Sequence, residues 1–372
     1  MKALLNNIIA IDFGESNLKM VQMAGGKVKK TAYAEMPDNI IRDGIIPSMD
    51  AMAEFVKETA HQNKIPKGNC AVVLPDALAF SKNVTLPVMT EEQLRYNLPF
   101  EFRDYTTEEK GRYFYDYAVQ RVVADETGEP KELQLFACAT LKTTIEEYRS
   151  MFRRAGFRLK AAMPEVFAYS SLVQGYQERT GNVDAENCII DIGYKSTRMV
   201  IMHEGWFFTQ RTFPFGTQDM VRAISENTAV GEHLAKTYLA CNYNGVLDNA
   251  ACKEIDNRFA IEIMKAINFY KFNNRDTSLN KAYLCGGGAS IQPLVDALAE
   301  AVGMEMHDIG TDAGIHDGRH KAMALRQGGR HWPEGLRGEK RDYENRAQTG
   351  KIPYQAKRQL SHAGGTVRQP RH

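Results

Sequence analysis

The first 36 residues alternate apolar stretches with short polar turns. Residues 7–13 form a nearly continuous apolar run, and apolar and polar side chains partly alternate within 17–24 and 27–36, which are the patterns of a buried strand followed by half-buried strands. Gly25 and Gly26 separate the second stretch from the third, and a tight hairpin turn favours glycine there. The pattern predicts that the chain begins with a three-stranded antiparallel meander.

The spacing of apolar residues then changes to that of a helix over 48–63. A buried strand follows over 70–80, interrupted by Pro75. From 84 to 162 strand and helix patterns alternate, which predicts a small α+β subdomain. Residues 163–178 predict a further helix, with Pro164 in its first turn.

The second half opens with another strand–turn–strand–strand pattern, over 188–216. Helical patterns fill about 219–273, and a strand at 281–285 leads through Gly286–Gly288 into an amphipathic helix over 290–303. Beyond Arg326 the apolar content falls. Residues 327–372 contain ten Lys/Arg and four Asp/Glu, so we expect a basic, disordered tail.

The two strand–turn–strand patterns are copies of each other. When Asp12 is set on Asp191, the stretches align without a gap, and the matched pairs include Gly14 with Gly193 and Lys19 with Arg198. Each copy is a buried strand that ends in Asp-x-Gly, then a polar turn, and then a second apolar strand. Such a repeat predicts two related halves that face each other.

Paired Asp-x-Gly turns point to phosphate chemistry. A carboxylate at the end of a strand can hold Mg²⁺ through water, and the glycine lets backbone N–H groups approach phosphate oxygens. The bare backbone of Gly286–Gly288 leaves room for a ribose or a base. One Asp-x-Gly alone would mean little, but the ungapped repeat together with the glycine triplet is specific. The other common phosphate motifs, G-x-G-x-x-G after a strand and G-x-x-x-x-G-K-[ST], are absent from the sequence.

Composition narrows the class of protein. The 372 residues are 43% hydrophobic and 25% charged, as in soluble globular proteins of one or two domains. The sequence contains no apolar run long enough for a membrane-spanning helix, and its start lacks a small-residue cleavage site, so we do not expect export. The six cysteines form no C-x-x-C, which disfavours zinc or a disulfide framework and favours the cytosol.

These motifs resemble those of the actin/Hsp70/sugar-kinase superfamily of ATP-binding folds. Within it the chain resembles the PilM family of cytoplasmic actin-like proteins of type IV pilus assembly, which are relatives of the division protein FtsA. The resemblance covers about 8–326. The segments that carry it are 11–19, 72–87, 91–94, 139–156, 164–168, 191–202, 212–220, 267–272 and 283–294.

The resemblance implies an α/β fold with two actin-like, ribonuclease-H-like lobes. The first lobe would span 1–185 and carry an inserted α+β subdomain at about 70–162, a feature of PilM-like and FtsA-like proteins. The second lobe would span 186–326, with a helical subdomain at about 217–278. Residues 327–372 would form the disordered tail.

The resemblance also implies a site for ATP and Mg²⁺. Asp12 and Asp191 would face Mg²⁺ through water, and Lys19 would reach the phosphates. Glu165 matches a residue that orients the attacking water in Hsp70, although a carboxylate at a helix N-terminus also simply favours the helix dipole. The other residues implied in cofactor binding are Gly14, Ser16, Asn17, Gly193, Lys195, Ser196 and Thr197 in the two turns, and Gly286, Gly287 and Gly288 against the adenosine.

Two residues depart from the family pattern. Glu15 follows Gly14 directly, and a carboxylate within about 4 Å of a phosphate would cost on the order of 1–4 kcal/mol unless Mg²⁺ or Lys19 offsets it. Tyr194 could crowd the phosphate, whereas Lys195 could help to hold it. The expected enzymatic activity is at most that of a slow ATPase.

The function implied by the resemblance is that of an ATP-binding scaffold at the inner face of the cell membrane. It would dock the N-terminal cytoplasmic peptide of a PilN-like membrane protein in a groove between the first lobe and the inserted subdomain. A pilus motor ATPase and self-association are further expected contacts, whereas no specific nucleic acid is expected. The sequence does not separate a type IV pilus from a related type II secretion or competence system.

Three alternatives stay open on the sequence. The first is a scaffold of the same fold that has lost its nucleotide, and the second is a small-molecule kinase of the same superfamily. The third is an FtsA-like filament former anchored by its C-terminus, but the tail lacks the apolar face that an anchoring helix needs.

Overall fold

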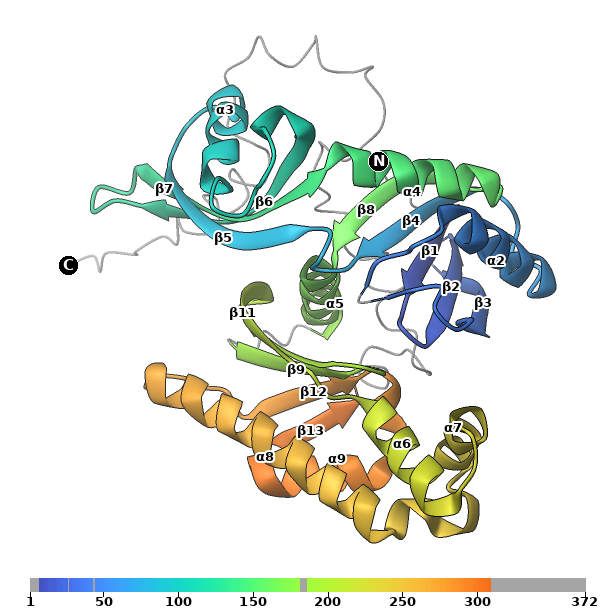
Figure 1. Cartoon of the computed structure of the whole chain (residues 1–372). Helices are drawn as coiled ribbons and strands as arrows, with labels where there is room; N and C mark the ends of the chain where they lie inside the picture. Colours follow the sequence, from blue (N-terminus) through green and yellow to red (C-terminus); the bar gives the residue numbers. More distant parts are fainter. Residues whose placement is uncertain (1–6, 26, 43, 181–185, 309–372) are drawn as a thin grey trace.

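The structure is a computed structural model, which describes residues 7–25, 27–42, 44–180 and 186–308. The expected basic tail lies outside the described residues. The described chain forms two lobes, each built on a five-stranded sheet, with helix α5 (Glu165–Thr180) between them (Figure 1). No helix within the described ranges has both the length and the apolar character needed to cross a membrane.

The two large sheets have the same topology. Their strand orders are β3-β2-β1-β4-β8 and β11-β10-β9-β12-β13, so each consists of an antiparallel meander followed by two parallel strands. The first sheet comprises β1 (Asn7–Phe13), β2 (Asn17–Ala24), β3 (Lys27–Glu35), β4 (Asn69–Leu74) and β8 (Arg158–Pro164). The second comprises β9 (Glu186–Ile192), β10 (Thr197–His203), β11 (Trp206–Phe213), β12 (Lys281–Cys285) and β13 (Glu305–Asp308). The sequence repeat is therefore a repeat of structure.

Strand alternation explains where the paired aspartates point. On β1, Ile9 and Ile11 pack under helices α2 (Met49–Gln62) and α4 (Lys142–Arg154), whereas Ile8 and Ala10 pack against α5. Asp12 shares the face of Ile8 and Ala10, because side chains two residues apart lie on one side of a strand. By the same alternation Asp191 shares the face of Ile189, which also packs against α5. Both carboxylates therefore belong to the faces that look into the space between the lobes.

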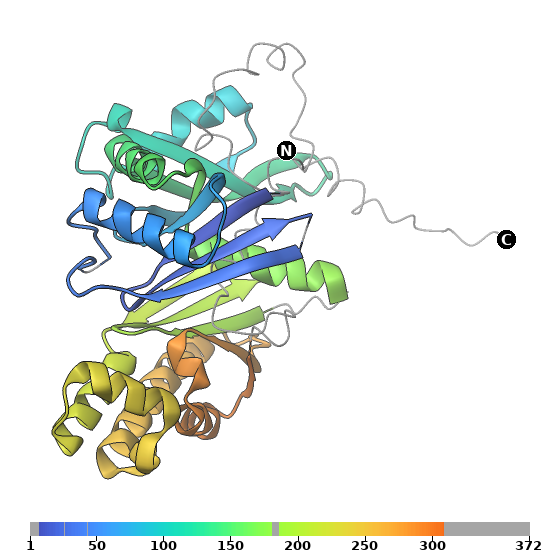
Figure 2. The ribbon, with the colours of Figure 1, turned by 90° about the vertical axis from the view of Figure 1, so that its right-hand side faces the viewer.

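Helix α5 is buried between the two sheets. Its residues 165–173 are all buried, and residues of both sheets join it in one apolar core. A helix without a polar face fits this position, because sheets cover it on two sides. In the view of Figure 2 it lies between the strands of the first lobe and those of the second.

A smaller sheet is inserted into the first lobe. It has the order β5-β7-β6, with strands β5 (Phe80–Pro87), β6 (Tyr113–Ala124) and β7 (Pro130–Leu141). Helix α3 (Glu91–Glu101) supplies Leu94 and Leu98 to its core, and a short 3-10 turn (Lys110–Arg112) precedes β6. The insertion is shorter than the expected 70–162, because β4 and β8 pair with each other in the large sheet and α4 packs on α2.

The second lobe carries its helices on the face away from α5. These are α6 (Thr217–Thr228), α7 (Glu232–Cys241), α8 (Ala250–Asn273) and α9 (Gln292–Val302), with short 3-10 segments at Tyr243–Asp248 and Gly287–Ser290. Apolar residues of β9, including Ile190 and Ile192, pack with α8 and α9. Helices α6, α7 and α8 together occupy the stretch in which a helical subdomain was expected.

Candidate functional site

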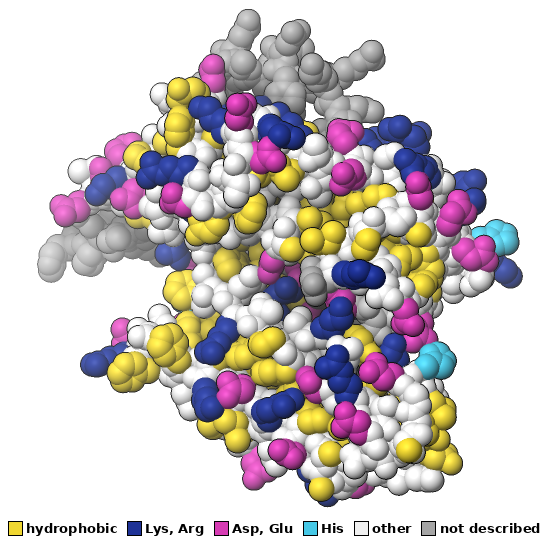
Figure 3. All heavy atoms as spheres, in the orientation of Figure 1, with side chains coloured by type: hydrophobic (Ala, Val, Ile, Leu, Met, Phe, Trp, Pro, Cys, Tyr) yellow, Lys and Arg dark blue, Asp and Glu magenta, His cyan; other side chains and the backbone are white. Residues whose placement is uncertain are grey.

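A large cavity lies between the two lobes. Its volume is about 1810 Å³, and charged side chains of both signs line the boundary between the lobes (Figure 3). Of the predicted site residues, those that line the cavity are Asp12, Gly14, Ser16, Asn17, Lys19, Glu165, Asp191, Gly193, Lys195, Ser196, Gly286 and Gly287. Twelve positions that are far apart in the sequence thus share one space.

Two predicted residues lie behind the wall of this cavity. The buried hydroxyl of Thr197 donates to the carbonyl oxygen of Phe215 at 2.9 Å, so it fixes the strand that follows the turn. Gly288 is buried against Ile192, and a Cβ atom there would lie 2.2 Å from the Ile192 side chain. Both residues support the site from behind.

The two Asp-x-Gly turns have the same backbone geometry. Gly14 donates its N–H to the carbonyl oxygen of Asn17 at 3.0 Å, and Gly193 does the same to Ser196 at 3.0 Å. A Cβ atom at Gly193 would lie 2.8 Å from that Ser196 oxygen, closer than real contacts allow. Glycine is therefore required for so tight a turn.

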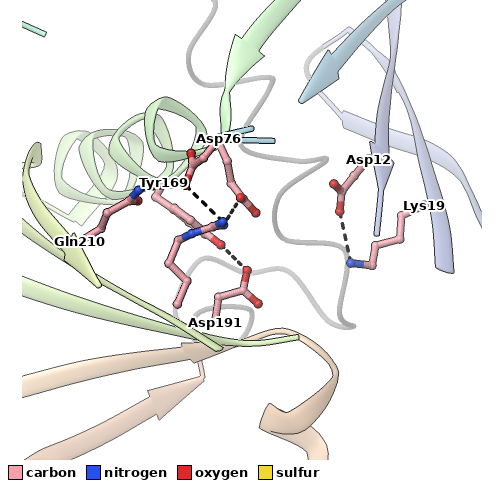
Figure 4. A network of polar contacts seen from close by, with 8 residues as sticks. Asp12, Lys19, Asp76, Tyr169, Asp191 and Gln210 are labelled. Carbon is pink, nitrogen blue, oxygen red and sulfur yellow. Dashed lines mark hydrogen bonds and ion pairs between the residues drawn. The ribbon is translucent and has the colours of Figure 1, made fainter. Parts of the chain in front are cut away.

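The two aspartates have different partners. Asp12 forms an ion pair with Lys19, its register neighbour on β2, at 3.2 Å, whereas Asp191 accepts a hydrogen bond from the buried hydroxyl of Tyr169 on α5 (Figure 4). Burial would lower the pKa of Lys19, but the charges of Asp12 and Asp191 outweigh it and raise that pKa. Burial raises the pKa of Asp191. Both carboxylates thus act on one lysine from opposite lobes.

Gly286 brings β12 against the second turn. Its φ is +83°, and a Cβ atom would lie 2.4 Å from both Asp191 Oδ1 and the carbonyl oxygen of Ile192. Gly287, the next residue, lines the cavity, and apart from its chain neighbours no described residue places an atom within 4 Å of its Cβ position. One glycine therefore makes room for the carboxylate, and the other leaves open space.

Glu15 has two partners that account for its position. One carboxylate oxygen accepts the Gly44 N–H at 2.8 Å, and the other lies 3.0 Å from Lys195 Nζ of the second lobe. The negative charge that seemed out of place in the first turn is thus offset by a cation from the second turn. Lys195 is correspondingly engaged with a carboxylate in this structure.

A second set of interlobe contacts lies at the floor of the cavity. Arg198 forms ion pairs with Glu165, at the start of α5, and with Asp76, at 3.3 Å, in the loop after β4. Gln210 on β11 donates to Asp76 at 2.9 Å (Figure 4). Sequence reasoning assigned no role to Asp76, Arg198 or Tyr169. The sequence contains two signals for them. Arg198 matches Lys19 in the repeat, and Asp76 lies just after a buried strand.

Tyr194 lies against the wall formed by α7. Lys236 Nζ is 5.0 Å from the centroid of the Tyr194 ring and 3.0 Å from Glu35 of the first lobe. His233, also on α7, lies 3.7 Å from the same Glu35 carboxylate. These contacts join the end of β3 to α7 across the rim of the cavity.

The charged side chains of the cavity would hold Mg²⁺ through water rather than by direct ligation. Among the described residues no three His, Cys, Asp or Glu side chains are grouped closely enough to hold a metal ion, although seven acidic and four basic side chains line the cavity and Mg²⁺ in proteins usually keeps several of its waters. The excess of acidic groups would oppose a bare polyphosphate, so the cation and the anion would be expected to enter together.

Comparison with known proteins gives one family and several similar folds. Residues 10–322 match the family model of type IV pilus assembly protein PilM. A solved PilM-PilN type IV pilus biogenesis complex contains a chain that is 18% identical, with a TM-score of 0.72 and coverage of 87% of this chain and 98% of that one. No curated protein matches the chain.

Two other solved structures share the architecture. Ethanolamine utilization protein EutJ from Carboxydothermus hydrogenoformans is 13% identical, with a TM-score of 0.54 and coverage of 86% of this chain and 88% of that one. MreB 5 of Spiroplasma citri, solved with AMPPNP, is 12% identical, with a TM-score of 0.50 and coverage of 87% and 96%. The resemblance inferred from the sequence is confirmed, as is the two-lobed actin-like fold, and the chain belongs to the family of type IV pilus assembly protein PilM.

Proposed function

We propose that the protein binds Mg²⁺–ATP between its lobes and serves as a scaffold in the assembly of a type IV pilus. The observation that carries the nucleotide proposal is the convergence of two matching Asp-x-Gly turns on one cavity, with Asp12 and Asp191 on the interlobe faces of their sheets. The similarity to MreB 5, which was solved with AMPPNP, supports the choice of ligand.

In this proposal each element of the cavity has its own role. Asp12 and Asp191 would hold Mg²⁺ through water, and the backbone of the turns at Gly14 and Gly193 would face phosphate oxygens. Lys19 would remain cationic beside them, since the two carboxylates raise its pKa. The bound Mg²⁺ would neutralise phosphate charge, and Gly287 would leave room for the adenosine.

We propose further that the bound nucleotide is turned over slowly at most. Glu165, the candidate for orienting water, is buried and ion-paired with Arg198. A carboxylate whose lone pairs accept guanidinium protons is poorly placed to accept a proton from water. Catalytic phosphoryl transfer to a metabolite, as in the kinases of this fold, would need a free carboxylate of this kind.

The proposed partner is the N-terminal cytoplasmic peptide of a PilN-like membrane protein. Membership of the PilM family and the similarity to a PilM-PilN complex support it. The inserted subdomain would form one side of the expected groove, and Tyr96 and Phe100 on α3, which are exposed, would contact an apolar peptide. The protein itself would then be cytoplasmic and reach the inner face of the membrane through this partner.

The nucleotide proposal is tested by equilibrium dialysis with radiolabelled ATP, with Mg²⁺ and with EDTA. We expect micromolar binding with Mg²⁺ and loss of binding in EDTA, because the cavity carries more acidic than basic side chains. Equal binding under both conditions would contradict the role of the cation. No binding under either would favour a scaffold that has lost its ligand.

The partner proposal is tested by fluorescence anisotropy with a labelled N-terminal peptide of the PilN-like protein from the same organism. A scrambled peptide of identical composition is the control. We expect saturable binding of the native peptide alone, while equal binding of both would contradict a specific groove.

A further inference from the structure

Arg198 departs from its counterpart in the first lobe. Lys19 and Arg198 hold the same register positions, opposite Asp12 and Asp191 respectively. Lys19 pairs with its own register neighbour, Asp12. Arg198 instead pairs with Asp76 and Glu165, which both belong to the first lobe or the helix that follows it. The duplicated position thus serves a different purpose in each lobe.

Arg198 forms its ion pairs in a largely buried position, so the loss of its charge should be costly. Its side chain is 14% exposed, and that of Glu165 is 8% exposed, so water screens the charges weakly. Without the guanidinium, Asp76 and Glu165 would leave two carboxylates in one partly buried space. Removing one partner from a buried pair is costly, because the remaining charge is uncompensated.

One other interlobe ion pair is exposed, and neither of its residues lines the cavity. Arg121 on β6 pairs with Glu204 at the β10–β11 turn at 2.5 Å, and the two side chains are 53% and 57% exposed. Pairs of this kind contribute little to stability. The Arg121–Glu204 pair therefore serves as a matched control for a contact that joins the lobes without touching Glu165.

We infer that Arg198 is a positioning residue with two effects. It holds the first lobe against the second through Asp76 and Glu165, and it keeps the Glu165 carboxylate engaged, so that bound ATP is retained rather than hydrolysed. The second effect rests on the proposed function, whereas the first does not. The site would accordingly be built for a long-lived nucleotide complex, and hydrolysis would require the lobes to separate at Arg198.

The first effect is tested without nucleotide by hydrogen–deuterium exchange of the full chain. In Arg198→Gln we expect amides in 75–80 and 163–168 to exchange at least fivefold faster than in wild type. Arg121→Gln should leave these segments unchanged. Unchanged exchange in Arg198→Gln would overturn the positioning role. If Arg198→Gln does not fold, Arg198→Lys, which keeps the charge but loses the planar fork, should give a smaller increase in the same segments.

The second effect is tested by single-turnover release of phosphate from Mg²⁺–ATP. We expect Arg198→Gln to release phosphate at least fivefold faster than wild type, and the double variant Arg198→Gln/Glu165→Gln to lose that gain. Arg121→Gln should release phosphate at the wild-type rate. This effect would be overturned if Arg198→Gln bound ATP but released phosphate no faster than wild type. It would also be overturned if the double variant kept the faster release. Absence of ATP binding by wild type would refute the proposed function instead, and the exchange experiment would still decide the first effect.

Discussion

Lys195, just after the second Asp-x-Gly turn, forms an ion pair with Glu15, just after the first, at 3.0 Å across the cavity. Glu15 directly follows Gly14 of the first turn, and Lys195 lies two residues after Gly193 of the second. It explains how a carboxylate can stand beside a predicted phosphate position, because a cation from the opposite lobe accompanies it.

The first prediction follows from this pair. Lys195→Met leaves Glu15 without its cation, so Mg²⁺–ATP affinity should fall by about fivefold, equivalent to about 1 kcal/mol. Glu15→Ser/Lys195→Met should recover part of the loss, because the uncompensated carboxylate is gone. A double-mutant cycle by isothermal titration calorimetry measures the coupling. Strictly additive effects of the two changes would contradict the predicted compensation.

The second prediction concerns two neighbouring glycines. Gly286→Ala places a methyl group 2.4 Å from Asp191 Oδ1 at a φ of +83°, and should lower the free energy of unfolding by on the order of 2–4 kcal/mol. Gly287→Ala meets no atom of the other described residues within 4 Å, its chain neighbours aside, and should unfold at the wild-type denaturant concentration. Urea unfolding followed by circular dichroism compares them.

Gly287 also tests where the adenosine lies. Because its Cβ position opens into the cavity, Gly287→Val should weaken Mg²⁺–ATP binding while the midpoint of unfolding stays near that of wild type. Unchanged affinity would place the nucleoside elsewhere in the cavity.

The third prediction is a pH dependence of stability. Asp256 on α8 is buried, its Oδ1 atom has no hydrogen-bond partner among the described residues, and burial raises its pKa from 3.8 to about 6. The folded state therefore binds this proton more tightly than the unfolded state does. Its contribution to stability is present below about pH 4 and is lost as the pH rises through about 6.

Asp256→Asn should remove that pH dependence, because the amide stays uncharged at every pH, as the protonated carboxyl does at low pH. Relative to wild type, we expect the variant to gain about 1 kcal/mol in free energy of unfolding at pH 8 and little at pH 4.5. Glu254→Gln, an exposed change on the same helix, is the control and should show no such trend. Urea unfolding across this pH range measures it, and a gain that does not vary with pH would refute a buried ionisation at Asp256.

The sequence pattern predicted the strands of both meanders, since each meander opens with a buried apolar run and its turns contain glycine. The ungapped repeat also predicted that Asp12 and Asp191 belong to matching elements, which the equal registers of β1–β2 and β9–β10 confirm. The ends of the inserted subdomain were not predicted, because the pattern of β4 does not indicate which sheet that strand joins, and no separate strand was predicted at β8. Pairing between residues 69–74 and 158–164 is a long-range contact that local pattern does not contain.

The contacts between lobes were equally inaccessible to sequence reasoning. Nothing local indicates that Arg198 turns toward Asp76 and Glu165 while its counterpart Lys19 turns toward Asp12. Likewise, the Tyr169–Asp191 hydrogen bond depends on the placement of α5 between two sheets. Such contacts follow from how the lobes are arranged, and only the structure provides that arrangement.

The most direct test of the account is calorimetric titration of Mg²⁺–ATP into wild type, Asp12→Asn and Asp191→Asn. These changes keep the size of each side chain and remove the charge that faces the proposed cation. We predict micromolar binding by wild type and at least a tenfold loss in each variant, with the midpoint of thermal unfolding retained. Wild-type affinity in both variants would contradict a nucleotide held between the two Asp-x-Gly turns.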